Sequence, residues 1–502
     1  MLKVRNLQTI NLEETAIDVE AVKLIPEDIA VSNCLIAFKQ NKDNLFIAVN
    51  RNLDIFLYEE LKFITGKSIE FFYSPKHCIV NAVNSYYCKN SVQSVVRAIE
   101  EEKDANTKEK KFSFKEEESL QQFPIVKLTN HLVNSAICKN ASDIHLEPFQ
   151  DQLLVRFRVD GIMMEFLSIP LDIYPHICTR LKIMASLNIA EKRVPQDGKI
   201  EFVYDNANYD LRISTLPTVY GEKIVVRILY KSEGLNSLSS LGFSDRDEKD
   251  IKFMLTNPHG ILLVSGPTGS GKTTTLYSML QTFNKKEKNI TSIEDPVEYT
   301  VDNVNQVNVN NKIGFSFPEG LRSILRQDPD IIMIGEIRDE ETAQIAIRAA
   351  VTGHLVISTI HTNDAAAAVL RLKDMGVPSY FIEDAVIGII AQRLVRKICT
   401  FCKKEYSPTE NEKEYLNLDT ENKLFKGEGC NNCSGTGYNG RTIIYELIDF
   451  RELRKKGFKL KDSAEELRKF SFKEGIGSIR ENCEMLVKEG ITTFDELLRI
   501  NL

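Results

Sequence analysis

The stretch that most constrains the fold of this chain is the run 266–274, which reads GPTGSGKTT. Its spacing, G-x-x-x-x-G-K-[ST], is the pattern of a phosphate-binding loop, which needs a strand before it and a helix after it. Both are expected here, because the apolar run 261–264 precedes the loop and a helical pattern, 273–283, follows it. A chance glycine-rich turn is the alternative, and it would not require this flanking pattern. The run therefore predicts an α/β domain that binds a nucleotide.

Each part of this loop has a predicted task. The glycines let backbone N–H groups approach phosphate oxygens, and the start of the following helix adds a favourable dipole. Lys272 is expected to reach the β- and γ-phosphates of ATP, and the Thr273 hydroxyl is expected to bind Mg²⁺. The predicted nucleotide-binding residues of the loop are Gly266, Pro267, Thr268, Gly269, Ser270, Gly271, Lys272, Thr273 and Thr274.

Three further strand-like runs end in residues suited to phosphate chemistry. The run 293–298, IEDPVE, ends in clustered carboxylates, and the apolar run 330–335 leads into Glu336. Carboxylates so placed can hold the water ligands of Mg²⁺ and orient the attacking water, a role we predict for Glu336. The run 355–360 leads into His361, which we expect to sense the γ-phosphate; a purely structural histidine is the alternative.

Arginines are candidates because phosphoryl transfer builds negative charge that a guanidinium can stabilise. Arg322 and Arg326 are four residues apart on a predicted helix and would share one face of it. Arg212 and Arg227 belong to an earlier part of the chain. For each arginine alone, an exposed ion pair is the alternative.

Four cysteines form two CxxC pairs, Cys399 with Cys402 and Cys430 with Cys433. Two such pairs at this separation predict a tetrahedral Zn²⁺ site of structural type, because four thiolates leave no open position for catalysis. A redox pair is the weaker alternative. The other six of the ten cysteines are scattered, and we expect them to be small core or surface residues.

Composition narrows the class of protein. Apolar and charged contents of 43% and 27% are those of an ordinary globular chain, and a net charge of −7 argues against a general nucleic-acid binder. No apolar run reaches the length that crosses a bilayer, and the acidic residues in the first twenty positions do not fit a signal peptide. We therefore expect a cytoplasmic protein.

The order of patterns predicts several domains. A small α/β domain is expected at 17–90, with strands at 34–38, 45–49 and 68–72 and a helix at 53–64. A charged segment at 91–122 is predicted to be a linker, and a solvated helix is the alternative. A sheet-and-helix domain at 123–230, a Ser/Gly-rich hinge at 231–240 and a nucleotide domain at 241–502, with a zinc subdomain at 396–440, complete the expected arrangement.

Taken together, the motifs resemble one family. The phosphate loop is followed in the family's order by the acidic box at 294–298, by GEIRD at 335–339 and by STIHTND at 358–364. ASDIHLEP at 141–148 and RFRVDG at 156–161 match the family's second domain. The chain thus resembles the secretion ATPase superfamily, specifically the motors of type IV pilus assembly and type II secretion, from about Leu24 onward. The tetracysteine insertion is typical of that assembly and secretion branch.

The resemblance implies a fold and an activity. It implies a RecA-like P-loop NTPase domain, a PAS-like α+β second domain and a homohexamer that hydrolyses ATP with Mg²⁺. By motif matching, Glu298 and Glu336 are the catalytic glutamates and His361 is the histidine-box residue. The nucleotide-facing arginines would be Arg212, Arg227, Arg322 and Arg326.

The resemblance also implies partners and a place of action. ATP-driven closure of the second and ATPase domains would move an inner-membrane platform protein, which adds pilin or pseudopilin subunits to a filament. The chain would act at the cytoplasmic face of that membrane, attached through partners, with residues 17–90 as a docking domain. Some relatives bind cyclic di-GMP through Arg-Leu-Gly and Leu-x-x-x-Gly elements, and positions 1–60 contain no match to these.

Three functional hypotheses remain at this point. A motor for filament assembly or secretion fits all the motifs, and the abundance of Lys, Asn and Ile favours pili over secretion. A nucleic-acid motor would need a basic, aromatic-bearing channel, whereas the chain is acidic and contains no tryptophan. A nucleotide-binding scaffold without turnover would not need Lys272, Glu298 and Glu336 together.

Overall fold

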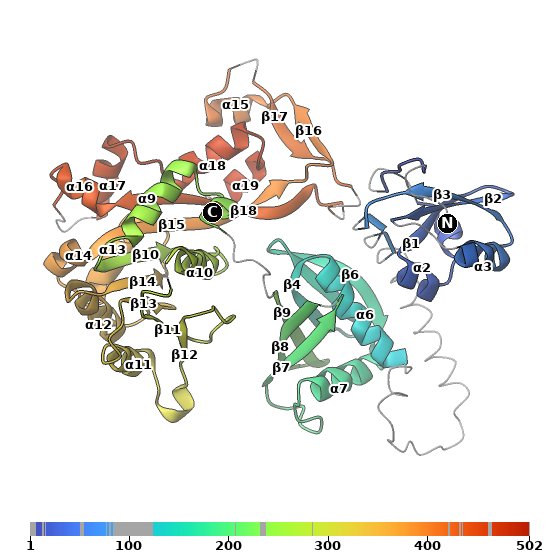
Figure 1. Cartoon of the computed structure of the whole chain (residues 1–502), viewed down its shortest axis with the longest axis horizontal. Helices are drawn as coiled ribbons and strands as arrows, with labels where there is room; N and C mark the ends of the chain where they lie inside the picture. Colours follow the sequence, from blue (N-terminus) through green and yellow to red (C-terminus); the bar gives the residue numbers. More distant parts are fainter. Residues whose placement is uncertain are drawn as a thin grey trace. The chain divides into compact units, whose positions relative to one another are not determined.

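The computed structural model describes residues 7–12, 15, 17–50, 55–76, 78–79, 82–83, 124–205, 207–230, 237–283, 285–419, 422–430, 433, 435–459 and 464–500 (Figure 1). The predicted linker at 91–122 lies outside them. By internal contacts the chain divides into two units, one comprising Met1–Lys231 with Gly429–Thr436 and the other Ser232–Glu428 with Gly437–Leu502. Each unit is described by itself.

The first unit begins with a small three-stranded sheet. Its elements are α1 (Val19–Val22), α2 (Glu27–Asn33), β1 (Leu35–Gln40), β2 (Asn44–Val49), α3 (Ile55–Thr65) and β3 (Ser68–Tyr73). β1 and β2 are antiparallel, and β2 and β3 are parallel. The three predicted strands and the predicted helix are confirmed close to their expected bounds, because their apolar residues are the ones that form the buried core of this sheet.

The same unit contains a six-stranded antiparallel sheet in the order β6-β5-β4-β9-β8-β7. Its elements are α6 (Pro124–Cys138), β4 (Ala141–Pro148), β5 (Gln152–Val159), β6 (Ile162–Pro170), a 3₁₀ turn η2 (Leu171–Ile173), α7 (Tyr174–Met184), β7 (Gln196–Tyr204), β8 (Ala207–Thr218) and β9 (Gly221–Tyr230). Asp160 and Gly161 form the predicted hairpin turn, both with positive φ. α6 and α7 share one apolar core with the sheet.

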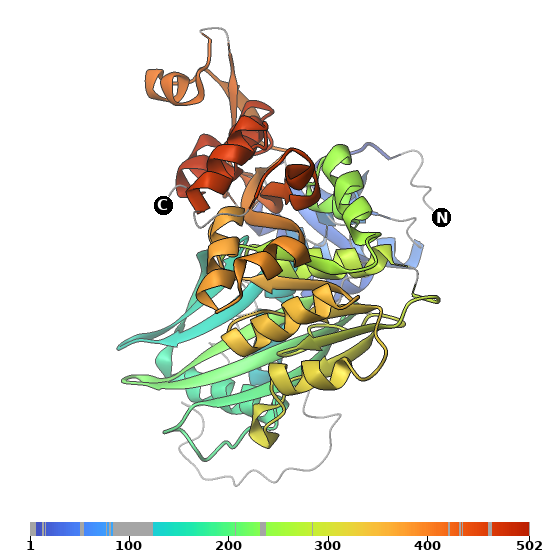
Figure 2. The same ribbon diagram turned by 90° about the vertical axis from the view of Figure 1, so that its left-hand side faces the viewer.

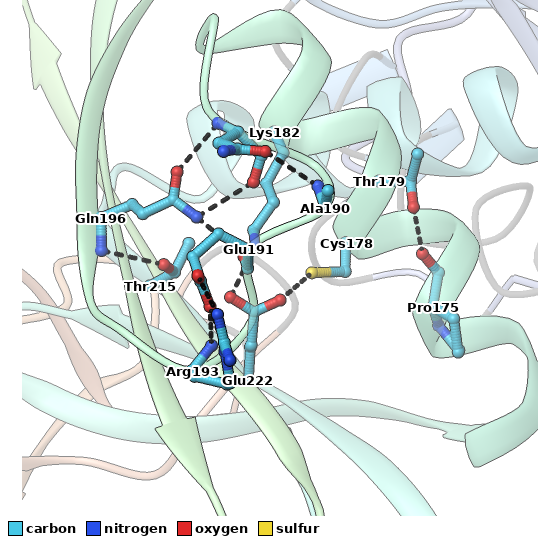
Figure 3. Close-up of polar contacts among 11 residues, drawn as sticks. Pro175, Cys178, Thr179, Lys182, Ala190, Glu191, Arg193, Gln196, Thr215 and Glu222 are labelled. Carbon is cyan, nitrogen blue, oxygen red and sulfur yellow. Dashed lines mark hydrogen bonds and ion pairs between the residues drawn. The ribbon is translucent and has the colours of Figure 1, made fainter.

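A buried ion pair fixes one end of this sheet (Figure 3). Lys182 of α7 lies 2.6 Å from Glu222 of β9, and both side chains are almost fully buried. Lys182 Nζ also donates to the Glu191 carbonyl at 2.7 Å, and Gln196 Nε2 donates to the same carbonyl at 2.9 Å. Because a buried ammonium and carboxylate each need partners, this network holds the loop between α7 and β7 in one conformation.

The second unit is built on a seven-stranded sheet in the order β12-β11-β13-β14-β10-β15-β18. Its strands are β10 (Gly260–Ser265), β11 (Ile290–Glu294), β12 (Asn305–Asn308), β13 (Ile331–Ile334), β14 (Leu355–Ile360), β15 (Val386–Ile398) and β18 (Tyr438–Asp449). All neighbours are parallel except β18, which is antiparallel to β15. Strands of this kind are predicted by continuous apolar runs, since helices cover both faces.

Successive side chains of β10 point alternately to the two faces of the sheet and so belong to two different cores. Ile261 and Leu263 belong to one core with α12 (Glu340–Val351) and α13 (Ala365–Asp374). Leu262 and Val264 belong to the opposite core with α9 (Asp245–Leu255) and α10 (Lys272–Thr282). The helical layers can be followed in Figures 1 and 2, in which α11 (Phe317–Ile324) and α14 (Ser379–Ala385) are also seen.

The predicted hinge at 231–240 stays a prediction, and the boundary between the two units, after Lys231, falls within it. Positions 231–236 lie outside the described residues, but Leu238–Leu241 form a short helix, α8, capped by the Ser237 hydroxyl. Ser237, within the predicted hinge, and Ser244, beyond it, are helix N-caps, because each accepts from a backbone N–H of the helix that follows.

The C-terminal part of the second unit forms a small additional subdomain beside the seven-stranded sheet. It contains β16 (Lys403–Tyr406), α15 (Glu410–Leu416), β17 (Leu424–Gly427), α18 (Ile479–Lys488) and α19 (Phe494–Ile500), which share a small core with β15 and β18. α16 (Phe450–Lys455) and α17 (Ala464–Lys473) instead pack on the main core through Leu453 and Leu467.

Candidate active site

The phosphate loop lies at the carboxyl end of β10, between β14 and β15 in the sheet. Gly266, Gly269 and Gly271 all have positive φ, and a Cβ at Gly266 would come within 2.4 Å of the Gln392 carbonyl. Only glycine therefore fits at position 266. Gly271 is the N-cap of α10, and Thr273 and Thr274 are exposed in the first turn of that helix. This geometry suits a bound triphosphate, with Thr273 available for Mg²⁺.

Gln392 of β15 is a residue that the sequence did not single out. Its amide Nε2 donates to the Ser270 carbonyl at 2.8 Å, and its Oε1 accepts from the Thr275 hydroxyl at 2.9 Å. The fully buried side chain thus fastens the loop to both β15 and α10. The available signal was a lone glutamine after a long apolar run, which is unusual in a buried strand.

Lys272 is buried and donates to the carbonyls of Gly266 and Pro267, each at 2.9 Å. Burial lowers the pKa of its ammonium to about 8, and the nearby Glu336 carboxylate only partly opposes that shift. A negative charge added at the loop, such as a phosphate, would therefore stabilise the charged form of the Lys272 ammonium.

Glu336 and His361 meet beside the loop. Glu336 follows β13 and His361 follows β14, and these parallel neighbours deliver their ends to one edge of the sheet. The Thr359 hydroxyl donates to the Gly335 carbonyl at 2.7 Å, and His361 Nε2 lies 3.4 Å from a Glu336 carboxylate oxygen. Burial and then Lys272 lower the pKa of His361, so it is neutral near pH 7.

A pocket of about 340 Å³ opens at the same place and includes Pro267 and His361 in its lining. Arg338 also pairs with Glu336 at 2.6 Å. The predicted residues Lys272, Glu336 and His361 are thus brought together, with the electrostatics that a γ-phosphate site needs.

The acidic box divides into a structural and an accessible part. Glu294 is buried and accepts from the Tyr277 hydroxyl, from Ser292 at 2.6 Å and from Gln306 at 3.2 Å. Glu298 is only partly buried, and its backbone N–H donates to the Tyr277 hydroxyl at 3.3 Å. Of the two, Glu298 is the one that can reach a ligand, and its catalytic role stays a prediction.

The arginines lie in different settings. The expectation that Arg322 and Arg326 share a helix is wrong, because α11 ends at Ile324 and Arg326 lies in the turn beyond it. Arg322 pairs with Glu341 of α12, and Arg326 donates to the Arg322 carbonyl at 2.9 Å. The helix cannot continue far beyond Arg326, because Asp328 has a positive φ and precedes Pro329, which disfavours helical backbone at that position.

In the first unit, Arg212 of β8 and Arg227 of β9 are directly opposite each other in the antiparallel register. They therefore lie on one face of that sheet. Arg227 pairs with Asp143 at 2.9 Å while its side chain stays 63% exposed. The predicted part of these two arginines in nucleotide binding stays a prediction.

The four predicted cysteines form one cluster. Their Sγ atoms all lie within 4.8 Å of one another, and the Cys430 and Cys433 sulfurs are 3.7 Å apart. Thiolates at about 2.3 Å from a tetrahedral Zn²⁺ would be about 3.8 Å from each other, so the cluster fits zinc. The Cys399 N–H donates to the Gly437 carbonyl at 2.9 Å, and the Glu428 N–H donates to the Cys402 carbonyl at 3.1 Å.

Within the described part of the chain, no helix is long and apolar enough to cross a membrane.

A glycine loop at the end of a central parallel strand, with a histidine from the adjacent strand and a glutamate from the strand beyond it, defines a P-loop nucleoside triphosphatase. The "Type II/IV secretion system protein" family matches residues 118–499, and an MshEN domain matches residues 5–89. The chain therefore belongs to the type II/IV secretion system protein family and is an ATPase.

Similar proteins come from both branches of that family. "Type II secretion system protein E" of Pseudomonas aeruginosa is 46% identical over 379 residues, which is 75% of each chain. "Type IV pilus assembly ATPase PilB" of Myxococcus xanthus is 39% identical over 500 residues and spans 97% of this chain and 88% of its own. The X-ray structure of the Legionella pneumophila ATPase DotB aligns with a TM-score of 0.55 at 20% identity, over 75% of this chain and 95% of that one, and shows the same fold.

Proposed function

We propose that this chain is the ATP-hydrolysing motor of type IV pilus assembly, working as a homohexamer on an inner-membrane platform protein. The observation that carries the catalytic part is the meeting of Lys272, Glu336 and His361 beside the phosphate loop. Support for the pilus branch comes from the pilus assembly ATPases of Myxococcus xanthus and Thermus thermophilus, with which the similarity extends over 97% of this chain. The secretion relatives match 75% or 76% of it.

In the proposed reaction a water attacks the γ-phosphorus of ATP, the bond to the β–γ bridging oxygen breaks, and ADP and phosphate leave. Glu336 orients that water and accepts its proton, while Lys272 and the predicted arginines would stabilise the charge on the transferred group. Mg²⁺, held through Thr273, would neutralise charge on the phosphates. Neutral His361 contacts the γ-phosphate through its ring, so the loop at 361–364 senses whether that phosphate is present.

Motion would follow from the arginines of the first unit. Arg212 and Arg227, on one face of the antiparallel sheet, would engage the nucleotide bound to the second unit and release it after hydrolysis. Such closure and opening would be passed to the platform protein and from there to pilin subunits. Residues 17–90 would dock the motor on its partners, in the cytoplasm at the inner face of the membrane.

The catalytic part is tested with Lys272→Ala in the full chain. We expect ATP turnover to fall by about 10³-fold or more, because the loop loses the cation that would contact the β- and γ-phosphates. Lys252→Ala is the matched control, since the exposed Lys252 of α9 makes only an (i,i+4) ion pair, with Glu248, among the contacts described for it. Turnover of Lys272→Ala close to that of the control would contradict the proposed site.

A second candidate, the type II secretion motor, is favoured by the 46% identity to the Pseudomonas aeruginosa protein. Deleting the gene in its own host separates the two. Loss of surface filaments with unchanged protein export supports the pilus motor, whereas loss of exported proteins with filaments intact supports the secretion motor.

A further inference from the structure

The loop that carries His361 is fixed at its far end by Asp364. Asp364 is the N-cap of α13, and its Oδ1 accepts from the Ala367 N–H at 2.6 Å. The Thr362 hydroxyl donates to the Asp364 carbonyl at 3.1 Å, which ties the middle of the loop to the same residue. The position of His361 therefore depends on how Asp364 is held.

Arg468 of α17 holds the second oxygen of that carboxylate. Its Nη2 and Nε donate to Asp364 Oδ2 at 2.8 Å and 3.1 Å. This contact joins positions more than one hundred apart in the chain, and it comes from a helix that is not otherwise part of the site. Leu467, the neighbour of Arg468, is fully buried in the main core, so α17 offers the guanidinium from a fixed base.

Arg468 acts on a second acid besides Asp364, so its role goes beyond that of an isolated surface ion pair. Glu446 of β18 accepts from the Ala365 N–H, and the Asp364 and Glu446 carboxylates repel each other. Arg468 is the cation that acts on both, since it also favours the charged form of Glu446. An exposed ion pair alone contributes little, but removing this cation would leave two acids facing each other at the start of α13.

We propose that Arg468 is a positioning residue for ATP hydrolysis: by holding Asp364, it keeps the loop that carries His361 in place beside Glu336. The inference rests on the proposed role of His361 at the γ-phosphate. It links the C-terminal helix α17 to the catalytic edge of the sheet, so that a displacement of α17 would change the rate of the chemical step.

The test compares steady-state ATP turnover of full-length Arg468→Ala, His361→Ala and the double variant. We expect Arg468→Ala to lower kcat about tenfold with KM for ATP nearly unchanged, because a displaced catalytic loop slows chemistry more than binding. The double variant should be no slower than His361→Ala alone, since Arg468 acts through that residue. Arg468→Lys, which keeps the charge, should recover part of the rate.

Two further variants control for stability. Lys469→Ala removes an exposed pair with Glu465 from the same helix and should leave kcat unchanged. Asp364→Asn keeps an N-cap acceptor but loses the ion pair, so it should match Arg468→Ala in kcat with a similar melting temperature. Unchanged kcat in Arg468→Ala, or losses that multiply in the double variant, would overturn the inference. Unchanged turnover in His361→Ala would instead contradict the proposed site itself.

Discussion

The free energy of unfolding should depend on pH through the Glu446 carboxyl group. Burial first, and then the Asp364 carboxylate, raise the pKa of Glu446 from 4.5 to about 7. The folded chain therefore holds this proton more tightly than the unfolded chain, so the stability contributed by Glu446 is complete below pH 4.5 and is lost as the pH rises through 7. Glu446→Gln replaces the protonated form by a neutral group of the same shape, which does not titrate.

The size of the effect follows from the two pKa values. Ionisation of Glu446 costs the folded state about 1 kcal/mol at pH 5.5 and about 3 kcal/mol at pH 8.5. Between these pH values the free energy of unfolding of Glu446→Gln should thus rise by about 2 kcal/mol relative to the unsubstituted chain. In a unit of this size that corresponds to about 4–8 °C in the melting temperature.

Differential scanning calorimetry of the two full chains at both pH values measures this difference. Comparing pH values removes any constant change in the hydrogen bond with the Ala365 N–H. Glu405→Gln, at an exposed position of β16, is the control and should show the same difference from the unsubstituted chain at both pH values. A melting-temperature difference for Glu446→Gln that does not grow with pH would refute the reasoning.

Lys272, with a pKa of about 8, should take up close to half a proton when ATP binds at pH 8, because phosphate favours its charged form; calorimetric titration in buffers of different ionisation enthalpy measures this uptake, and Lys272→Arg should abolish it. Glu336→Gln should bind ATP with nearly unchanged affinity but hydrolyse it about 10²–10⁴-fold more slowly, and turnover at the original rate would show that another group orients the water. Cys430→Ser should lose zinc, as measured by metal analysis of the purified chain, while ATP affinity changes by less than about threefold; full zinc content would refute the four-cysteine site.

The elements that the sequence predicts well are those whose cause is local. The phosphate loop needs glycines at fixed spacing, and the strands of the parallel sheet are apolar along their whole length because both faces are covered. Glu336 and His361 could be placed beside the loop, since parallel strands bring their carboxyl ends to one edge. The cysteine spacing likewise predicts the cluster that forms.

The contacts that hold these residues in position could not be predicted, because their partners are distant in sequence. Gln392 reaches Ser270, and Arg468 reaches Asp364, only after the sheet and its helices have packed. The charged pair of Lys182 and Glu222 would be expected at the surface from residue type alone, yet it is buried. Helix ends were the least predictable feature, as the position of Arg326 in the turn after α11 shows, since the end of a short helix varies by one or two residues with its cap and the residues that follow.

Strand β15 explains why loss of zinc should spare nucleotide binding. The middle of the strand carries Gln392, which fastens the phosphate loop, and Cys399 of the metal cluster follows its carboxyl end. Between them Arg396 is held by Glu496, with Nε and Nη2 at 3.0 Å and 2.9 Å from one oxygen, and by the Thr492 hydroxyl on its carbonyl at 2.8 Å. These partly buried contacts fix β15 independently of the metal. Disorder that begins at the cysteines should therefore stop at Arg396, more than 10 Å along the strand from the loop contact by the usual rise of about 3.3 Å per residue.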